Sequence, residues 1–519
     1  MLVRLIRPKG KGTPVSTVLD LILRNMVVSK SMEAKNTRWI WRVTGGLVII
    51  FWLVMMGLLL NRYHIAPINI SKIFHASLKD KEEWASIYLH NQKVGYSVTT
   101  VTKNEGGYLL GEQTFMQLKV MDQPQQITTY TICQVDNDFL LKSFNFRLVS
   151  GLITFSAEGE VKGHKLDLTI ETAGERSRKE IPVAEIPFLP SALKPFLVHR
   201  GIKVGDHYKL PLWDPATQSS HVITVDVEKK ESITLNNQNF QAFCIRTDFM
   251  GMTLRSWVSQ DGDLLKEEGP MGIIIIKSTK EEALSDITAE SLDILSTTSI
   301  PCSPIQKPRM SKYLKVRLSG SPLTGFNLNS GRQTVKGDTL VVAQEVIKHE
   351  ASYQIPNKNQ LYINYLRPSL LIQSNHPEIV KAAQGIIGNE RNSVKVAQLL
   401  TQWVYNHVEK KPILSIPSAL EVLKHKIGDC NEHSALLTAL LRAVGIPARP
   451  CVGILYSEGR FYYHAWVEAY LGDWVSIDPV LNQMPTDATH IKFIEGDLSK
   501  QVEMLRVVGK IRVEVIGVE

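Results

Sequence analysis

The chain has 519 residues, which at about 100–200 residues per domain predicts two to four domains. Its 44% hydrophobic and 21% charged residues are ordinary for a globular protein and exclude collagen-like, disulfide-dense and wholly disordered classes. Most of the net charge of +8 lies in residues 1–42, where nine Lys and Arg stand against Asp20 and Glu33. The rest of the chain carries almost no excess positive charge, so nucleic acid is not an expected partner.

The sequence after the basic cytoplasmic leader (1–42) predicts a transmembrane anchor. Residues 43–60 (VTGGLVIIFWLVMMGLLL) contain no charged residue and, extended back to Trp39, exceed the ~30 Å thickness of the hydrocarbon core. A cleaved signal peptide fits less well, because the leader is long and no small-x-small site follows the apolar run. The excess of Lys and Arg before the span predicts a cytoplasmic N-terminus. We therefore expect a single-pass inner-membrane protein, in contact with membrane lipid, whose main body is periplasmic or otherwise extracytoplasmic.

The spacing of hydrophobic residues divides the remaining sequence into regions of predicted strands and predicted helices. Alternation at period two, with hairpin signals such as Asp261-Gly262, indicates antiparallel strands, and only 191–198 within that region has a helical pattern. Helical periodicity takes over near Pro377. The expected divisions are a juxtamembrane linker (61–83), an antiparallel β-rich domain (84–295), a Ser/Thr/Pro linker (296–312), a small β segment (313–364) and a C-terminal domain (365–519). The β-rich domain contains no reactive cluster of residues. We interpret it as a scaffold, with presentation or shielding of a substrate as the alternative.

The chain has five cysteines: Cys133, Cys244, Cys302, Cys430 and Cys451. In an oxidising compartment an odd number leaves at least one thiol unpaired or bridged to another chain. The other four allow three pairings, among which the sequence does not choose. The spacing contains no C-x-x-C pair and no zinc-ribbon pattern.

Cys430 is expected in the first turn of a helix. A Leu-rich run with helical spacing follows it, and Gly445 and Pro447 mark the helix end. Unpaired N–H groups and the helix dipole at such a position predict a thiol pKa lowered from about 8.5 toward neutrality. A preceding helix is expected to begin with Ser418 and Glu421 as a capping box.

His464 and Asp478 are expected to lie close together. They belong to two predicted strands, 461–470 and 474–478, joined by a tight turn near Leu471. Cross-strand neighbours have Cβ atoms roughly 5 Å apart, close enough for a carboxylate–imidazole hydrogen bond. Such a bond fixes the imidazole tautomer and stabilises the imidazolium that forms when a thiol gives up its proton.

Three sequence blocks resemble the core of the transglutaminase-like superfamily. They are GDCNEHSALLTALLRAVGIPARPCVG (428–453), HAWVE (464–468) and WVSIDP (474–479), and the similarity covers about residues 365–495. The resemblance departs from the family pattern at Val480, where Thr is common, and at Glu432-His433, where an aromatic–small pair is common. The extra domains and calcium sites of the vertebrate cross-linking members are not recognisable.

The resemblance implies a papain-like α+β fold for a catalytic domain over 365–519, with Cys430 as nucleophile, His464 as base and Asp478 as the orienting acid. Members of the superfamily are acyl transferases, amide hydrolases or peptidases, and some are non-catalytic. The fold class expected for the whole chain is α+β, with this core preceded by the antiparallel β domain and one transmembrane helix. No cofactor or metal is implied. The expected substrate is a protein or peptide amide, while the acyl acceptor and the oligomeric state are left open.

Two alternatives belong to other functional classes. A non-catalytic envelope scaffold would retain the fold without an open site. A zinc protein would use Cys430 and His433, one helical turn apart, together with His464 and Asp478.

Overall fold

The structure is a computed structural model that describes residues 81–519 except 250 and 288–292. The predicted leader and membrane span lie outside the described residues, as does nearly all of the predicted juxtamembrane linker. Among the helices of the described residues, none is long and apolar enough to cross a membrane. The anchor is thus a prediction from sequence.

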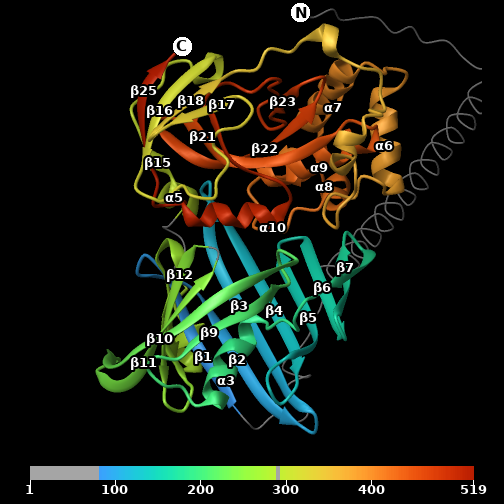
Figure 1. Cartoon of the computed structure of the whole chain (residues 1–519). Coiled ribbons are helices and arrows are strands. Elements are labelled where there is room, and N and C mark those ends of the chain that lie inside the picture. Colours follow the sequence, from blue (N-terminus) through green and yellow to red (C-terminus); the bar gives the residue numbers. More distant parts are fainter. Residues whose placement is uncertain (1–80, 250, 288–292) are drawn as a thin grey trace, which may run out of the picture. The chain divides into compact units, whose positions relative to one another are not determined.

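Residues 81–278 form one 14-stranded sheet in which every pair of neighbouring strands is antiparallel (Figure 1). The first strand pairs with both the second and the last, so it joins the two halves of the sheet. In the first half the strands are β1 (Lys81–Leu89), β2 (Gln92–Asn104), β3 (Gly107–Val120), β4 (Gln123–Val135), β5 (Leu141–Ser150), β6 (Ile153–Lys162), β7 (Lys165–Thr172) and β8 (Glu175–Pro182). The second half contains β9 (His207–Asp214), β10 (Ser219–Leu235), β11 (Gln238–Phe249), β12 (Met252–Ser259), β13 (Leu264–Glu268) and β14 (Ile273–Ser278).

The core of this sheet follows from the alternation in the sequence. In β7, Leu166, Leu168 and Ile170 are buried, and the residues between them are less so. They share one hydrophobic cluster with Trp213 of the other half and with helix α3 (Pro190–Arg200). The mostly antiparallel architecture is therefore as predicted, and α3 covers the segment that had the helical pattern.

The segment predicted to be a linker, 296–312, is more ordered than its composition suggested. It contains part of α5 (Ile294–Thr298), the short strand β15 (Ile300–Pro301) and a 3-10 turn. Ile300 pairs with Phe461 in the C-terminal sheet and is buried. The sequence did not indicate these elements, because a two-residue edge strand leaves no periodic signal in a Ser/Thr/Pro-rich stretch.

A four-stranded sheet follows, and its last strand comes from the C-terminus of the chain. Its strands are β16 (Tyr313–Ser319), β17 (Gln333–Lys336), β18 (Thr339–Ala343) and β25 (Arg512–Val518), in the order β17-β18-β16-β25. Leu314 and Val316 of β16 are fully buried and share a cluster with Val452, Phe461 and Ile491 of the next sheet. The small β segment is thus packed onto the C-terminal domain.

The C-terminal core consists of helices packed against a five-stranded sheet of order β15-β22-β21-β24, with β23 on β22 (Figure 1). The helices are α6 (Pro377–Ile387), α7 (Ser393–His407), α8 (Ala419–His425) and α9 (Cys430–Ala443). The strands are β21 (Ala448–Ser457), β22 (Arg460–Tyr470), β23 (Trp474–Ile477) and β24 (His490–Glu495). Helix α9 contacts β21 and β22 directly, which brings its first turn to the middle of the sheet. Further short helices and strands are α4 (Lys280–Leu284), β19 (Glu409–Lys410), β20 (Ile427–Gly428) and α10 (Leu498–Gln501).

Candidate active site

Cys430 is the first residue of α9, as predicted, and a capping box precedes it that the sequence analysis missed. Asp429 is the N-cap: its carboxylate accepts from the Asn431 N–H at 2.8 Å, and the Glu432 carboxylate accepts from the Asp429 N–H at 3.0 Å. A side chain on Gly428 would place its Cβ 2.2 Å from the Cβ of Glu432, so this turn requires glycine. The cap fixes the orientation of the helix start and therefore of Cys430.

The predicted lowering of the Cys430 pKa was wrong. Burial, followed by the negative charge of Asp429, raises the pKa of the Cys430 thiol well above its ordinary value. The prediction assumed that the N–H groups at the helix start are unpaired, whereas they already donate hydrogen bonds to the Asp429 carboxylate. An anion at the N-cap satisfies the positive end of the helix dipole and leaves less of it for a thiolate. The thiol is consequently protonated at neutral pH unless a base removes the proton.

Strand β22 places two groups beside the helix start. The Ala465 backbone N–H forms a hydrogen bond with the Cys430 sulfur, which partly offsets the rise in its pKa. The Tyr463 hydroxyl donates to the Asn431 side-chain oxygen at 2.9 Å. His464 lies between these two residues in the chain, so the two bonds hold the first turn of α9 against the part of β22 that carries His464.

The structure joins His464 and Asp478 as the sequence predicted. His464 Nε2 lies 2.9 Å from Asp478 Oδ2, and both side chains are buried. The β22–β23 register pairs Val467 with Ile477, so Asp478 follows directly after the last paired residue of β23. Because Nε2 is bonded to Asp478, Nδ1 is the ring nitrogen that can take a proton from a thiol.

The Asp478 carboxylate is fully buried and is satisfied by four donors. Its Oδ1 accepts the backbone N–H groups of Val480 at 2.7 Å and Leu481 at 3.1 Å. Its Oδ2 accepts from His464 and also from His490, at 3.1 Å. Burial alone would raise the pKa of Asp478, but the charges and hydrogen bonds of the two histidines hold it well below its usual range. Asp478 is therefore an anion throughout the physiological pH range.

His490 is the residue of this site that sequence reasoning missed. It is the first residue of β24 and pairs with Leu455 of β21, far from His464 in sequence. A Cβ on Gly453 would lie 1.9 Å from the Ile491 carbonyl oxygen, so β24 can approach β21 this closely only at glycine. A glycine in mid-strand signals close approach of backbones, but it does not indicate which strand approaches.

The four residues of the predicted zinc alternative do not come together as ligands. His433 is fully buried and its ring nitrogens face backbone carbonyls, Nδ1 at 2.7 Å from Asp429 O and Nε2 at 3.3 Å from Val408 O. Within the described ranges, ligand atoms of His464, Asp478 and His490 do lie within 4.8 Å of one another. Each histidine is hydrogen-bonded to Asp478, so a metal ion would have to displace both bonds. All five cysteines are free thiols.

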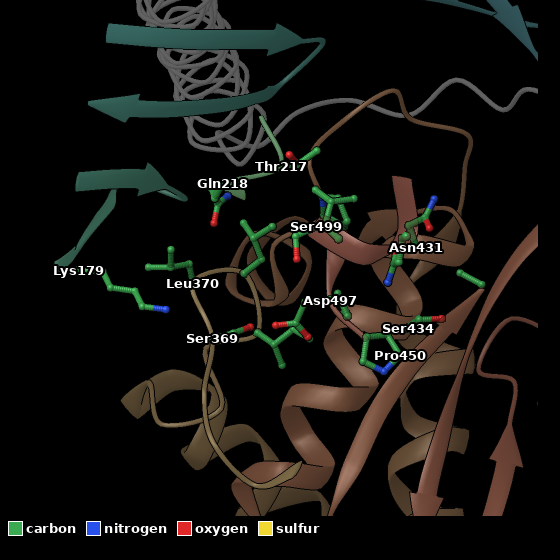
Figure 2. A pocket seen from close by; sticks show the side chains of 17 residues that line it. Lys179, Thr217, Gln218, Ser369, Leu370, Asn431, Ser434, Pro450, Asp497 and Ser499 are labelled. Atoms are coloured by element: carbon green, nitrogen blue, oxygen red, sulfur yellow. The ribbon is translucent and has the colours of Figure 1, made fainter. Parts of the chain in front are cut away.

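A cavity of about 140 Å³ adjoins the candidate site. Asn431 and Ser434 of α9 and Pro450 of β21 line it (Figure 2), together with Ala465 of β22. Ser434 is 1% exposed, and its hydroxyl has no hydrogen-bond partner in the described part of the chain. Further lining residues belong to the segments before α8 and after β24 and to the large sheet: Leu370, Pro417, Asp497, Ser499, Lys179, Thr217 and Gln218. Cys430, His464 and Asp478 do not line the cavity, but Asn431 and Ala465 directly follow two of them, so the cavity adjoins the candidate site.

Comparison with known proteins identifies the class of this domain. Residues 380–479 match the model of the transglutaminase-like superfamily. That segment contains Cys430, His464 and Asp478, so the domain that carries them is a transglutaminase-like core, as the three sequence blocks indicated. His490 lies beyond the matched residues.

Similar solved structures are distant. One is described as a "Putative Cysteine Protease" from Cytophaga hutchinsonii, with 18% identity, a TM-score of 0.28, and coverage of 40% of this chain and 86% of that one. Another is a β-barrel-like protein of a domain of unknown function from Brucella abortus, with 11% identity, a TM-score of 0.30, and coverage of 38% and 98%. No curated protein sequence matches the chain.

Proposed function

We propose that this chain is a membrane-anchored, thiol-dependent acyl transferase or amide hydrolase of transglutaminase-like type, acting outside the cytoplasm on protein or peptide amides. The observation that carries the proposal is the buried His464–Asp478 hydrogen bond at 2.9 Å, on the strand that packs against the start of the Cys430 helix. A carboxylate-oriented imidazole that acts as base on a thiol supplies the three roles of a nucleophilic triad.

In the proposed first half-reaction, Cys430 Sγ attacks the carbonyl carbon of the amide while its proton passes to His464 Nδ1. Asp478 stabilises the resulting imidazolium through Nε2. The imidazolium then protonates the amide nitrogen, the carbon–nitrogen bond breaks, and an amine or ammonia leaves. The product is a thioester between the acyl group and Cys430.

In the second half-reaction an acceptor opens the thioester. Neutral His464 takes a proton from water or from an amine, whose oxygen or nitrogen attacks the thioester carbon. The carbon–sulfur bond breaks and the thiolate recovers the proton from His464. Water gives hydrolysis or deamidation, and an amine gives a new amide. The two outcomes share every residue of the site.

The raised pKa of Cys430 requires that the thiol be deprotonated by His464 as it attacks, because little free thiolate exists at neutral pH. The same observation supports the second candidate, a non-catalytic scaffold, since a protonated thiol is also what an inert cysteine would present. Alkylation by iodoacetamide separates the two functions. His464-dependent alkylation of Cys430 supports the enzyme, whereas a thiol equally slow in wild type and His464→Ala supports the scaffold.

Acyl trapping tests the enzymatic function directly. Wild-type protein incubated with envelope peptides and acid-quenched should carry a thioester adduct on Cys430, visible as a mass increase of its tryptic peptide that hydroxylamine removes. Cys430→Ser and His464→Ala should lack the adduct, while Cys244→Ser should retain it. An adduct that persists in His464→Ala would contradict the proposed role of His464 as base.

The proposed location rests on the uncharged segment 43–60 and the basic leader. Protease added to cells with a permeabilised outer layer and an intact inner membrane should digest the domain over 365–519. Protection of that domain, with a cytoplasmic marker protected in parallel, would place it inside the cell instead.

A further inference from the structure

Both ring nitrogens of His490 face carboxylates. Nε2 lies 3.1 Å from Asp478 Oδ2, and Nδ1 lies 3.4 Å from Asp487 Oδ1. All three side chains are fully buried. The ring and the two carboxylates are therefore in direct contact. The protonation state of His490 decides how many hydrogen bonds it can donate to them.

A neutral imidazole carries one N–H, so it can donate to only one of these carboxylates and must turn a lone pair toward the other. The imidazolium donates to both. The two carboxylates raise the pKa of His490 despite its burial, in agreement with this geometry. The position of His490 between two carboxylates thus favours the imidazolium over the neutral imidazole.

We propose that His490 is a positioning residue of the active site: as a buried cation sharing the Asp478 carboxylate with His464, it limits how strongly Asp478 holds a proton on His464. The inference rests on the proposed function and adds a fourth member to the His464–Asp478 pair. Without the His490 cation, the full charge of Asp478 would act on His464 and raise its proton affinity. With it, His464 is a weaker base that can still return its proton to the leaving group.

The surroundings of His490 hold it in this role. The rings of His464 and Trp466 lie against it, with centroids at 5.8 Å and 5.3 Å. On the far side, the Asp487 carboxylate accepts from Thr489 and pairs with Arg309 at 2.8 Å. A second arginine, Arg332, donates to the Asp487 backbone carbonyl at 2.6 Å. The charges thus alternate from Arg309 through Asp487 and His490 to Asp478.

Two substitutions separate the charge of His490 from its hydrogen bond. His490→Gln keeps an N–H donor near the position of Nε2 and removes the charge, whereas His490→Phe removes both. The full-length protein, purified in detergent with a chelator present, is alkylated with iodoacetamide over a range of pH. The rate is followed at the Cys430 peptide by mass spectrometry, so the other four thiols do not interfere.

In wild type the rate should rise with pH through an inflection that reports the ionisation of His464, and His464→Ala should lack that inflection. His490→Gln should move the inflection to higher pH by about 1 unit, the shift expected when a charge within a few ångströms is removed. His490→Phe should lower the plateau rate by about 10-fold to 100-fold, the equivalent of a lost hydrogen bond to a charged group, with partial recovery in His490→Gln.

Leu400→Ala is the control for general destabilisation, because Leu400 is fully buried in α7 and belongs to a different hydrophobic cluster from β24. It should lower the unfolding temperature without moving the inflection. A profile of His490→Gln that coincides with wild type, or a Leu400→Ala profile that shifts equally, overturns the role of His490. If His464→Ala shows the same inflection as wild type, the proposed function itself is overturned.

Discussion

Asp478 Oδ2 lies 2.9 Å from His464 Nε2 and 3.1 Å from His490 Nε2, so a single oxygen atom receives two imidazole donors. The other oxygen is held by two backbone N–H groups of the turn that follows β23. With all four bonds directed at a fully buried carboxylate, the orientation of the group is fixed before substrate arrives. The expected effects of substituting Asp478 follow from these four hydrogen bonds.

Asp478→Asn should reduce acylation of Cys430 far more than it reduces folding. The asparagine amide keeps an oxygen that can accept from the turn. Its NH₂ group cannot accept a hydrogen bond from either histidine, and the negative charge of the carboxylate is lost. Loss of the imidazolium partner should lower the acylation rate on the order of 10³–10⁴-fold, as in other nucleophilic triads. Stopped-flow measurement of acyl-adduct formation tests this expectation. Full activity in Asp478→Asn would assign Asp478 to the turn alone.

Asp478 should also make folding stability depend on acid pH. Its pKa is held well below the value of about 3.9 that it has in the unfolded chain, so as the pH falls the unfolded state binds a proton first. The contribution of Asp478 is therefore present above about pH 4 and is lost as the pH falls further toward the folded pKa. Urea unfolding of wild type and Asp478→Asn should give free energies that converge between about pH 5 and pH 2. A constant difference over that range would show that the depressed pKa is not coupled to folding.

The two capping-box patterns of the C-terminal domain show how far local sequence can predict the site. Ser418 and Glu421 have the same spacing as Asp429 and Glu432, yet only the second pair forms the box. Ser418 has no side-chain bond to its helix, and the Gln373 side chain instead accepts from the Leu420 N–H at 3.2 Å. The predicted box at Ser418 was wrong because a distant residue supplied the cap.

The difference between local and distant contacts also explains which parts of the site were predicted and which part was missed. The helix start at Cys430 and the His464–Asp478 hairpin depend on residues within one or two elements, and their patterns were sufficient. His490 reaches Asp478 only because β24 pairs with β21, and β25 completes the small sheet by pairing with β16 from nearly 200 residues away. Pairings of that kind are decided by packing and leave no periodic signal of their own.

Cys451 should behave as the structural counterpart of Cys430. It is fully buried on β21, opposite Trp466 on β22, whereas Cys430 is partly exposed. Cys451→Ala should lower the free energy of unfolding by about 1–2 kcal/mol through the cavity it leaves, with acylation retained. Cys430→Ala should abolish acylation at a smaller cost in stability. Unfolding midpoints and adduct formation measured on both variants decide the assignment, and an exchange of the two phenotypes would move the nucleophile to Cys451.

The cavity next to the site should determine how well an acyl donor binds. Ser434 lines it with a buried hydroxyl that has no partner among the described residues, so a polar group of a substrate would gain a hydrogen bond there. Ser434→Ala removes that hydroxyl without adding bulk and should raise the KM for a good donor peptide about 5-fold to 10-fold, with little change in kcat. Ser434→Leu should fill part of the space and raise KM further. Ser393→Ala serves as a control for the loss of a buried hydroxyl, because Ser393 is equally buried at the start of α7, accepts from the Tyr353 N–H at 3.2 Å and does not line the cavity. Unchanged KM values in both Ser434 variants would show that the acyl donor binds elsewhere.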